Sequence, residues 1–248
     1  MNVKSHAHRF SLREWPQNAA ERQAYVDPIF STIATEYDFM TQALSFGMER
    51  RWKKRALSLL DHHSNAHLLD LATGTAAFPR LLALDGFQGR IVALDRNTTM
   101  LNLAKRKSPQ DREIRWLQGD LRELPFKDGS FDYITMGYGL RYPTDVRQIL
   151  TEIFRLLRPR GRFVCLDFGL PRDALYKRLC FAYLLVMGSF WGLLLHRKVD
   201  TYWHIVESLR AYPGQETVGK WLEGVGFCEV QLCEKLGGLV AILSGTRP

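Results

Sequence analysis

The sequence LLDLATGTAAF, residues 68–78, joins an apolar run that predicts a buried β-strand to a helix through one glycine, Gly74. A glycine directly after a strand lets the backbone turn sharply and approach a ligand, and the free N–H groups of the following helix point to the same place. A plain strand-to-helix turn would look much the same. The segment therefore predicts a β–α step, and it does not identify a ligand by itself.

The same alternation of strand and helix continues outward from this segment. Short apolar runs predict strands at 66–73, 90–95, 113–118, 131–137 and 161–168, and helical periodicity predicts helices at 77–84, 98–107 and 145–157. Two more strands are predicted at 227–234 and 239–245, after helical stretches at 200–209 and 216–224. Repeats of this kind are typical of a parallel sheet with helices on both faces.

The composition is that of a globular protein, with 46% hydrophobic and 24% charged residues in a chain of 248. The four cysteines form no C-x-x-C pair and no histidines cluster near them, so no metal site is expected. The formal net charge of +8 suits nucleic acid, acidic substrates or anionic lipid. The first thirty residues contain no apolar run of signal-peptide length, which predicts a cytoplasmic location.

Two carboxylates follow the second and third predicted strands. Asp95 lies about twenty residues beyond Gly74, a position from which a carboxylate accepts hydrogen bonds from ribose hydroxyls. Asp120 could accept a hydrogen bond from an adenine amino group beside the apolar edge of Leu121, or it could cap a turn. A G-x-G-x-x-G motif for a pyrophosphate is absent. A nucleoside without phosphate, such as S-adenosylmethionine, fits this loop better than a dinucleotide.

The segment LCFAYLLVMGSFWGLLL, from Leu179 to Leu195, has seventeen residues without a charge and basic residues at both ends. Its length is at the lower limit of about 17 to 25 residues for a membrane span. Three interpretations are open: a helix buried in the core, an apolar element on the surface of a bilayer, or a true span. The flanking basic residues would suit anionic headgroups.

The motifs LLDLATGT, ALDRN, QGDLRELPFKDGSFDYI and RLLRPRGRFVCLDF, in this order, resemble those of class I S-adenosylmethionine-dependent methyltransferases. More narrowly, the segments YDFMTQALSFGMERRWK (37–53), GYGLRYPTD (137–145) and DTYWHIVESLRAYPGQETVGKWLEGVGF (200–227) resemble the UbiE/MenG family. Members of that family methylate a ring carbon in menaquinone and ubiquinone biosynthesis. The likeness runs from about Tyr25 to the C-terminus, and its outer segments are more specific than the nucleotide loop.

The resemblance implies an α/β fold with a mostly parallel, seven-stranded, Rossmann-like sheet and helices on both faces. An N-terminal extension would occupy residues 1–24, and one methyltransferase domain would occupy 25–248. Within that domain we expect a helical cap at 25–65 and a helical lid at about 170–214. The lid is an insertion after the fifth strand, and we expect it over the carboxyl ends of the strands, where such sheets bind ligands.

Carried over by position, the resemblance assigns one group of residues to the cofactor and another to the ring. The cofactor residues are Thr75, Asp95, Asp120, Leu121 and Gly137, with Asp70 and Gly74 shaping the loop. Arg141, in the family's G-L-R stretch, would lie beside the quinol ring, and Tyr37 and Asp38 would close over the active site. Arg141 would stabilise a developing phenolate or position a water, since a guanidinium stays protonated and is a poor base. His204 is a further candidate near the ring.

The chain departs from the family pattern in the cofactor loop and near the ring. Ala76 and Ala77 stand where the family has a glycine and an acidic residue. Near the ring and in the fifth strand, Asn, His, Asn and Glu are replaced by Thr41, Glu49, Tyr142 and Asp167. The change at Ala77 removes a carboxylate that could hold the methionine amino group, and Ala76 restricts the backbone. Weaker cofactor binding, an altered cofactor pose and a changed reaction all stay open.

A prenylated quinol would keep its tail in a membrane, so the segment 179–195 is predicted to form a tail channel or a bilayer-facing lid. We therefore expect a peripheral protein on the cytoplasmic face of the membrane, and a homodimer is compatible with this. Two other functions stay open: methylation of another lipid or secondary-metabolite ring, and a non-catalytic role in membrane-associated assembly. A nucleic-acid partner is not expected, because no basic stripe with interleaved aromatics and no Asn-Pro-Pro-Tyr-like motif is present.

Overall fold

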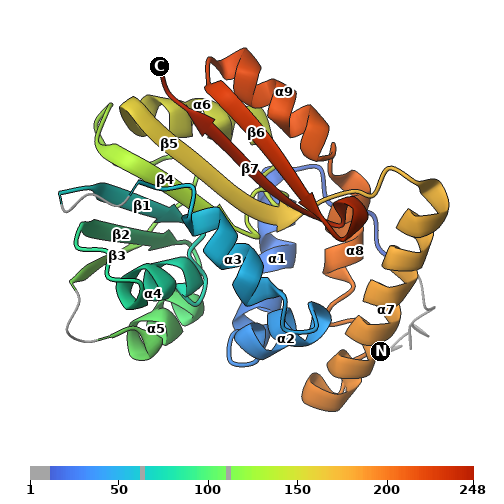
Figure 1. Ribbon diagram of the computed structural model, residues 1–248. Coiled ribbons are helices and arrows are strands. Elements are labelled where there is room, and N and C mark those ends of the chain that lie inside the picture. Colours follow the sequence, from blue (N-terminus) through green and yellow to red (C-terminus); the bar gives the residue numbers. More distant parts are fainter. Residues whose placement is uncertain (1–11, 62–64, 110–112) are drawn as a thin grey trace.

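A computed structural model describes residues 12–61, 65–109 and 113–248, and its strands form one sheet in the order β3-β2-β1-β4-β5-β7-β6 (Figure 1). The strands are β1 (His67–Leu71), β2 (Arg90–Asp95), β3 (Ile114–Gln118), β4 (Phe131–Gly137), β5 (Leu157–Phe168), β6 (Cys228–Lys235) and β7 (Val240–Thr246). Neighbouring strands are parallel from β3 to β5, and β7 is antiparallel to both β5 and β6. The predicted α/β, mostly parallel, seven-stranded sheet is confirmed.

Helices cover both faces of the sheet and one end of it. Their bounds are α1 (Ala19–Ile33), α2 (Tyr37–Leu44), α3 (Glu49–Leu57), α4 (Ala77–Leu84), α5 (Thr98–Lys107), α6 (Val146–Leu156), α7 (Ala174–His196), α8 (His204–Ala211) and α9 (Gln215–Val225), with a 3₁₀ turn η1 (Leu236–Gly238). Figure 1 shows α3, α4 and α5 on one face and α6 and α9 on the other. The helices α1, α2, α7 and α8 gather beyond the carboxyl ends of the parallel strands. They lie over the point between β1 and β4 where the strand order reverses, which is where sheets of this kind bind ligands.

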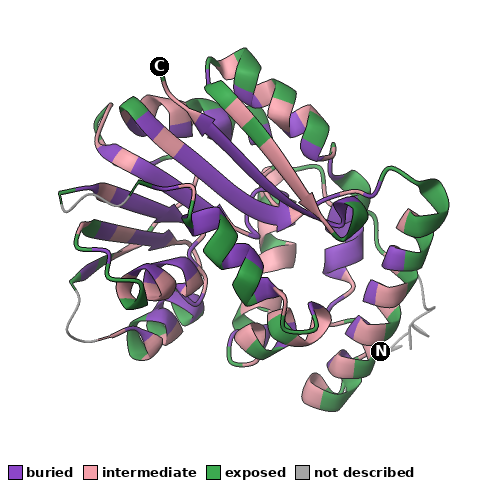
Figure 2. Cartoon of the chain, viewed as in Figure 1, coloured by how far each residue is buried: buried purple, intermediate pink, exposed green. Residues whose placement is uncertain are grey.

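The central strands are buried on both faces, as Figure 2 shows, because each face carries a helical layer. This explains why the sequence of β1 and β4 reads as continuous apolar runs and not as an alternating pattern. Most predicted elements agree with the structure to within a few residues.

Two element boundaries differ from the prediction. Strand β5 begins at Leu157 and not at 161, because Leu157 pairs with Phe131 before an irregularity that accommodates Arg160 in the left-handed region at φ 65°. Helix α1 begins at Ala19, inside the segment predicted as an extension, and residues 1–11 of that segment lie outside the described part of the chain.

Helix α7 contains the long apolar segment, and it is not enclosed by the core. Its buried residues, Cys180, Leu184, Gly188 and Gly192, form one stripe, and the helix contacts α2 and α8. The opposite face is exposed along its length (Figure 2), with Leu175, Leu179, Val186, Phe190, Leu193 and Leu194 each more than half exposed. The interpretation as a buried core helix is therefore wrong. Within the described ranges, α7 is the one helix long and apolar enough to cross a membrane.

The loops after β1 and β4 touch each other so closely that Gly139 has no room for a side chain. A Cβ on Gly139 would lie 2.7 Å from the Cβ of Ala72 and 3.3 Å from Cγ of Met136. We expect Gly139→Ala to lower the free energy of unfolding by about 2 kcal/mol in urea denaturation, because one of the two loops must move. Gly224→Ala is the matched control in α9, where no atom lies within 4 Å, and it should raise stability by about 0.5–1 kcal/mol. Equal stability of the two variants would contradict the close packing.

Candidate active site

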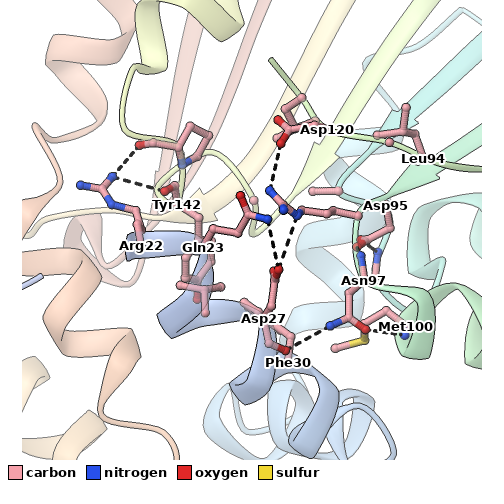
Figure 3. A pocket seen from close by; sticks show the side chains of 18 of the residues that line it. Arg22, Gln23, Asp27, Phe30, Leu94, Asp95, Asn97, Met100, Asp120 and Tyr142 are labelled. Atoms are coloured by element: carbon pink, nitrogen blue, oxygen red, sulfur yellow. Dashed lines mark hydrogen bonds and ion pairs between the residues drawn. The ribbon is translucent and has the colours of Figure 1, made fainter. Parts of the chain in front are cut away.

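A cavity of about 190 Å³ lies at the carboxyl ends of β1, β2, β3 and β4, under helix α1 (Figure 3). Five residues predicted to surround a cofactor line it, namely Gly74, Asp95, Asp120, Leu121 and Gly137. Ribose-binding and adenine-binding carboxylates were expected from different strands, and the parallel sheet brings both to the same cavity.

The loop after β1 has an unusual backbone. Ala72, Gly74 and Ala76 have φ angles of 49°, 53° and 59°, all in the left-handed region. Glycine adopts this region without a penalty, whereas an alanine there costs roughly 1–2 kcal/mol. Ala76 is fully buried and precedes α4, whereas Ala72 lines the cavity.

Asp95 connects the first two loops of the sheet. One carboxylate oxygen accepts the N–H of Gly74 at 2.7 Å, and the other accepts the N–H of Asn97 at 2.8 Å. Burial raises the pKa of Asp95 above its ordinary value, although these N–H groups act in the opposite direction. The side chain thus lines the cavity and also holds the glycine loop in position.

Asp70 and Thr75 lie behind the loop and do not line the cavity. The carboxylate of Asp70 accepts hydrogen bonds from the hydroxyls of Thr73 at 2.5 Å and Thr135 at 2.6 Å. Burial raises the pKa of Asp70 to about 7. Asp70 therefore supports the loop through Thr73, and its predicted role toward a cofactor stays a prediction.

Asp38 is held by the glycine loop after β1 and by two cations. Its carboxylate accepts hydrogen bonds from the hydroxyl of Thr75 at 2.5 Å, Arg80 at 2.8 Å and Lys107 at 3.1 Å. Asp38 lines neither of the two cavities described here. The structure places it where it links α2 to α4, α5 and the glycine loop, and its predicted catalytic role stays a prediction.

Helix α1 forms a cover over the cavity, and it begins before the predicted helical cap at 25–65. Arg96 bridges Asp27 of α1, at 3.4 Å, to Asp120, at 2.9 Å, and both carboxylates are labelled in Figure 3. Asp120 also pairs with Arg122 at 2.7 Å, and hydrogen bonding from Arg122 contributes most to lowering its pKa to about 2.

A second contact holds the other side of the cover. The guanidinium of Arg22 donates to the carbonyl oxygens of Tyr142 at 3.3 Å and Pro143 at 2.8 Å (Figure 3). The helix is thus fixed to the loops after β2, β3 and β4. No short sequence motif in α1 indicates that this helix covers the cavity.

A second cavity of about 50 Å³ adjoins the first. Phe30, Tyr37, Tyr138 and Tyr142 line both cavities, so the two share a wall of aromatic side chains. The second cavity is otherwise mostly apolar, with residues from α2, α7 and α8. Two predicted ring residues, Arg141 and Tyr37, and the further candidate His204 line it. Desolvation around the phenol of Tyr37 raises its pKa.

Arg141 is buried and paired with Asp167 from the end of β5. It also donates to the carbonyl of Tyr138 at 3.1 Å, Oγ of Ser208 at 3.3 Å and the hydroxyl of Tyr142 at 2.7 Å. These bonds use four of its five N–H groups within the described part of the chain. Burial disfavours its charge, but the carboxylate of Asp167 raises the pKa of Arg141 above its ordinary value. The cavity therefore contains a permanent positive charge.

The chain is similar in sequence to known proteins along most of its length. A model of the ubiE/COQ5 methyltransferase family matches residues 17–247. The ubiquinone/menaquinone biosynthesis C-methyltransferase UbiE of Teredinibacter turnerae is 33% identical, with 93% of this chain and 94% of that protein covered. The mitochondrial 2-methoxy-6-polyprenyl-1,4-benzoquinol methylase of Danio rerio is 31% identical, with 96% of this chain and 84% of that protein covered.

A solved structure shares the fold. Phosphoethanolamine N-methyltransferase 2 of Haemonchus contortus in complex with S-adenosyl-L-methionine superimposes with a TM-score of 0.61 at 12% identity, covering 80% of this chain and 52% of that one.

The strained alanine in the glycine loop gives a direct test of the loop geometry. Ala76→Gly should raise the free energy of unfolding by about 1 kcal/mol, because glycine adopts the left-handed region without a steric penalty. The matched control is Ala77→Gly, in the first turn of α4, which should lower stability by about 0.5 kcal/mol. Thermal denaturation of both variants measures the difference, and a loss of stability in Ala76→Gly would show that Ala76 is not strained.

Proposed function

The chain belongs to the ubiE/COQ5 methyltransferase family, and from this premise we propose that it transfers a methyl group from S-adenosylmethionine to a ring carbon of a prenylated quinol in isoprenoid quinone biosynthesis. The observation that supports this most directly is the pair of adjoining cavities. The first contains carboxylates and a glycine loop suited to a nucleoside, and the second is an aromatic pocket with one buried cation. Their shared wall would let a methyl donor and an aromatic ring meet.

The residues of the first cavity fit S-adenosylmethionine. Asp95 would hold the ribose hydroxyls, and Asp120 with Leu121 would hold the adenine. There is space for a ligand beside the backbone of Gly74, since a Cβ there would meet no atom within 4 Å. When bound, S-adenosylmethionine supplies a methyl group on a positively charged sulfur, and the electron pair of the broken carbon–sulfur bond stays on sulfur.

The chain's own residues would position the ring and stabilise its charge. Methyl transfer of this kind needs the ring carbon about 3–3.5 Å from the methyl group, so orientation is a large part of the catalysis. Aromatic side chains such as Phe30 and Phe168 would hold the ring and exclude water. The fixed charge of Arg141 would stabilise negative charge on the ring oxygen, because its position is set by Asp167 before the substrate binds.

Deleting the gene should cause a demethylated quinone precursor to accumulate, and mass spectrometry of extracted quinones measures it. Expression of the parent chain should restore the methylated quinone, whereas Asp95→Ala should not, because the variant lacks the carboxylate that holds the ribose. Asp128→Ala is the matched control, because the Asp128 side chain is 76% exposed and lines neither cavity. This variant should complement fully. An unchanged quinone profile in the deletion strain would overturn the assignment.

We also propose that helix α7 lies on the surface of a bilayer. Its exposed apolar face and the exposed Phe39 and Phe46 form one surface, which we call the apolar platform: Leu175, Leu179, Val186, Phe190, Leu193, Leu194, Phe39 and Phe46. The phenylalanines join α7 through ring contacts, Phe39 with Trp191 at 5.0 Å and Phe46 with Tyr183 at 5.7 Å. Lys177, Arg178, Arg197 and Lys198 lie at the two ends of the helix, where anionic headgroups would meet them.

Contact with a surface fits the structure better than a span. The buried stripe of α7 packs on α2 and α8, which carry charged residues such as Asp38 and Arg210. A spanning orientation would bring these polar helices toward the hydrocarbon, at a large cost in free energy. An interfacial orientation would bury only the apolar platform.

The parent chain should float with vesicles that contain anionic lipid in a density gradient, and Phe190→Glu with Leu193→Glu should abolish flotation. Leu84→Glu is the matched control, since Leu84 is 71% exposed but lies on α4, away from the platform. A homodimer joined through α7 would give a different result: the double variant would sediment as a smaller species, and the parent would not float.

A further inference from the structure

His204 is a buried histidine that lines the second cavity at the first residue of α8. Its Nδ1 lies 3.0 Å from the carbonyl oxygen of Thr201. A carbonyl oxygen only accepts hydrogen bonds, so Nδ1 carries the proton. Phe30 and Tyr142, both labelled in Figure 3, lie beside the imidazole with ring centroids 5.8 Å and 6.4 Å away.

Among residues 12–61, 65–109 and 113–248, the ring of His204 makes one hydrogen bond, through Nδ1, and none through Nε2. Burial, and next the charge of Arg141, lower the pKa of His204 to about 3, so the ring is neutral at physiological pH. Nε2 then carries a lone pair, which makes it an acceptor in a cavity whose strongest charged group, Arg141, is a donor.

The described residues that line this cavity include no aspartate and no glutamate. Arg141 is protonated, and burial raises the pKa values of Tyr37, Tyr138 and Tyr142, which keeps their phenols neutral. Within this lining, the imidazole of His204 is therefore the side chain best able to accept a proton.

On the basis of the proposed function, we propose that Nε2 of His204 accepts a hydrogen bond from a ring hydroxyl of the quinol, selects the reduced ring over the oxidised quinone, and takes the hydroxyl proton during methylation. A quinone oxygen has no hydrogen to donate, so it would leave Nε2 unpaired in a buried pocket. An unpaired buried acceptor weakens binding by roughly 10- to 100-fold.

The low basicity of His204 is compatible with this proton transfer. The hydroxyl of a free phenol titrates near 10. It becomes far more acidic as the new carbon–carbon bond withdraws electrons from the ring, and the proton can then move to a weak base. The electron pair of the O–H bond stays on oxygen and forms a ring carbonyl. The methylated carbon then loses its hydrogen as a proton to solvent, the oxygen takes its proton back from Nε2, and one proton is released overall.

The titratable groups around the imidazole come from several elements, and Arg141 among them is paired with Asp167. Arg141 and Tyr142 approach from the loop after β4, Tyr37 from α2 and Tyr202 from the turn before α8. Glu207, on the same helix, is held by Tyr25 at 2.5 Å and by the N–H of Arg13 at 2.8 Å. Arg141 is the one cation in this set, and its position disfavours a protonated His204 before the substrate binds.

Binding measurements test the selection of the reduced ring. A short-chain benzoquinol, kept reduced under anaerobic conditions, and the corresponding benzoquinone are titrated by calorimetry in the presence of S-adenosylhomocysteine. The parent should bind the quinol at least 10-fold more tightly than the quinone, and His204→Phe should bind both about equally. His204→Gln keeps an acceptor oxygen and should retain a preference. His67→Phe, at the first residue of β1 and outside the lining of both cavities, is the matched control and should behave as the parent.

The pH dependence of methylation tests the proton transfer. The parent should have a turnover number that is flat between pH 6 and pH 9, since His204 is neutral throughout. In His204→Phe the turnover number should fall and should rise with pH, because the hydroxyl must then ionise without a base. An unchanged preference for quinol together with an unchanged pH profile in folded His204→Phe would overturn the inference. A parent chain that methylates no quinol would overturn the proposed function instead, so the two failures are distinguishable.

Discussion

The buried ion pair between Arg141 and Asp167 sets the position of the loop after β4, and both cavities depend on that loop. Asp167 accepts the N–H of Leu140 at 2.9 Å and that of Arg141 at 3.3 Å, as well as the guanidinium of Arg141. The same loop supplies Tyr138 and Tyr142, which stand between the two cavities. Removing one partner of such a pair leaves a buried charge uncompensated, which is far more costly than replacing both. The ion pair therefore first fixes the position of the loop after β4. Its positive charge could act on a bound ring only because this position is fixed.

Three further carboxylates fix other loops and helices of the site, each with a different set of partners. Asp95 binds backbone N–H groups, Asp38 binds a hydroxyl and two cations, and Asp120 shares one cation, Arg96, with Asp27 of the covering helix. Asp38 touches, through Thr75, the loop in which the resemblance implies an acidic residue at the position of Ala77. A carboxylate is thus still coupled to this loop, although from a different element of the chain.

The sheet was predictable from the sequence because its central strands are buried on both faces and read as mostly apolar runs between helices. The carboxylates at its edge were predictable because parallel strands end together, as with Asp95 and Asp120. Arg141 depended on the resemblance, since a lone arginine in a loop has no pattern of its own. The cover formed by α1 was not predictable: Arg22 and Asp27 matter only through loops more than sixty residues away in sequence. Asp38 likewise appeared to face the ring, and only the fold shows it bound to Thr75, Arg80 and Lys107.

Helix α7 has two unlike neighbours on its opposite sides. Leu184, on its buried stripe, lines the second cavity, while Val186 and Phe190 are exposed. Gly188 keeps the helix close to the fold, since a Cβ there would lie 3.1 Å from the Cβ of Tyr202. One helix diameter, about 10 Å, then separates the second cavity from the exterior. Each methylene drawn into water costs about 0.8 kcal/mol, so a polyprenyl chain would resist any longer route. In the proposed orientation, the ring of the acceptor would enter the protein while its hydrocarbon tail stays in the lipid. Turnover would then not require the protein to leave the membrane.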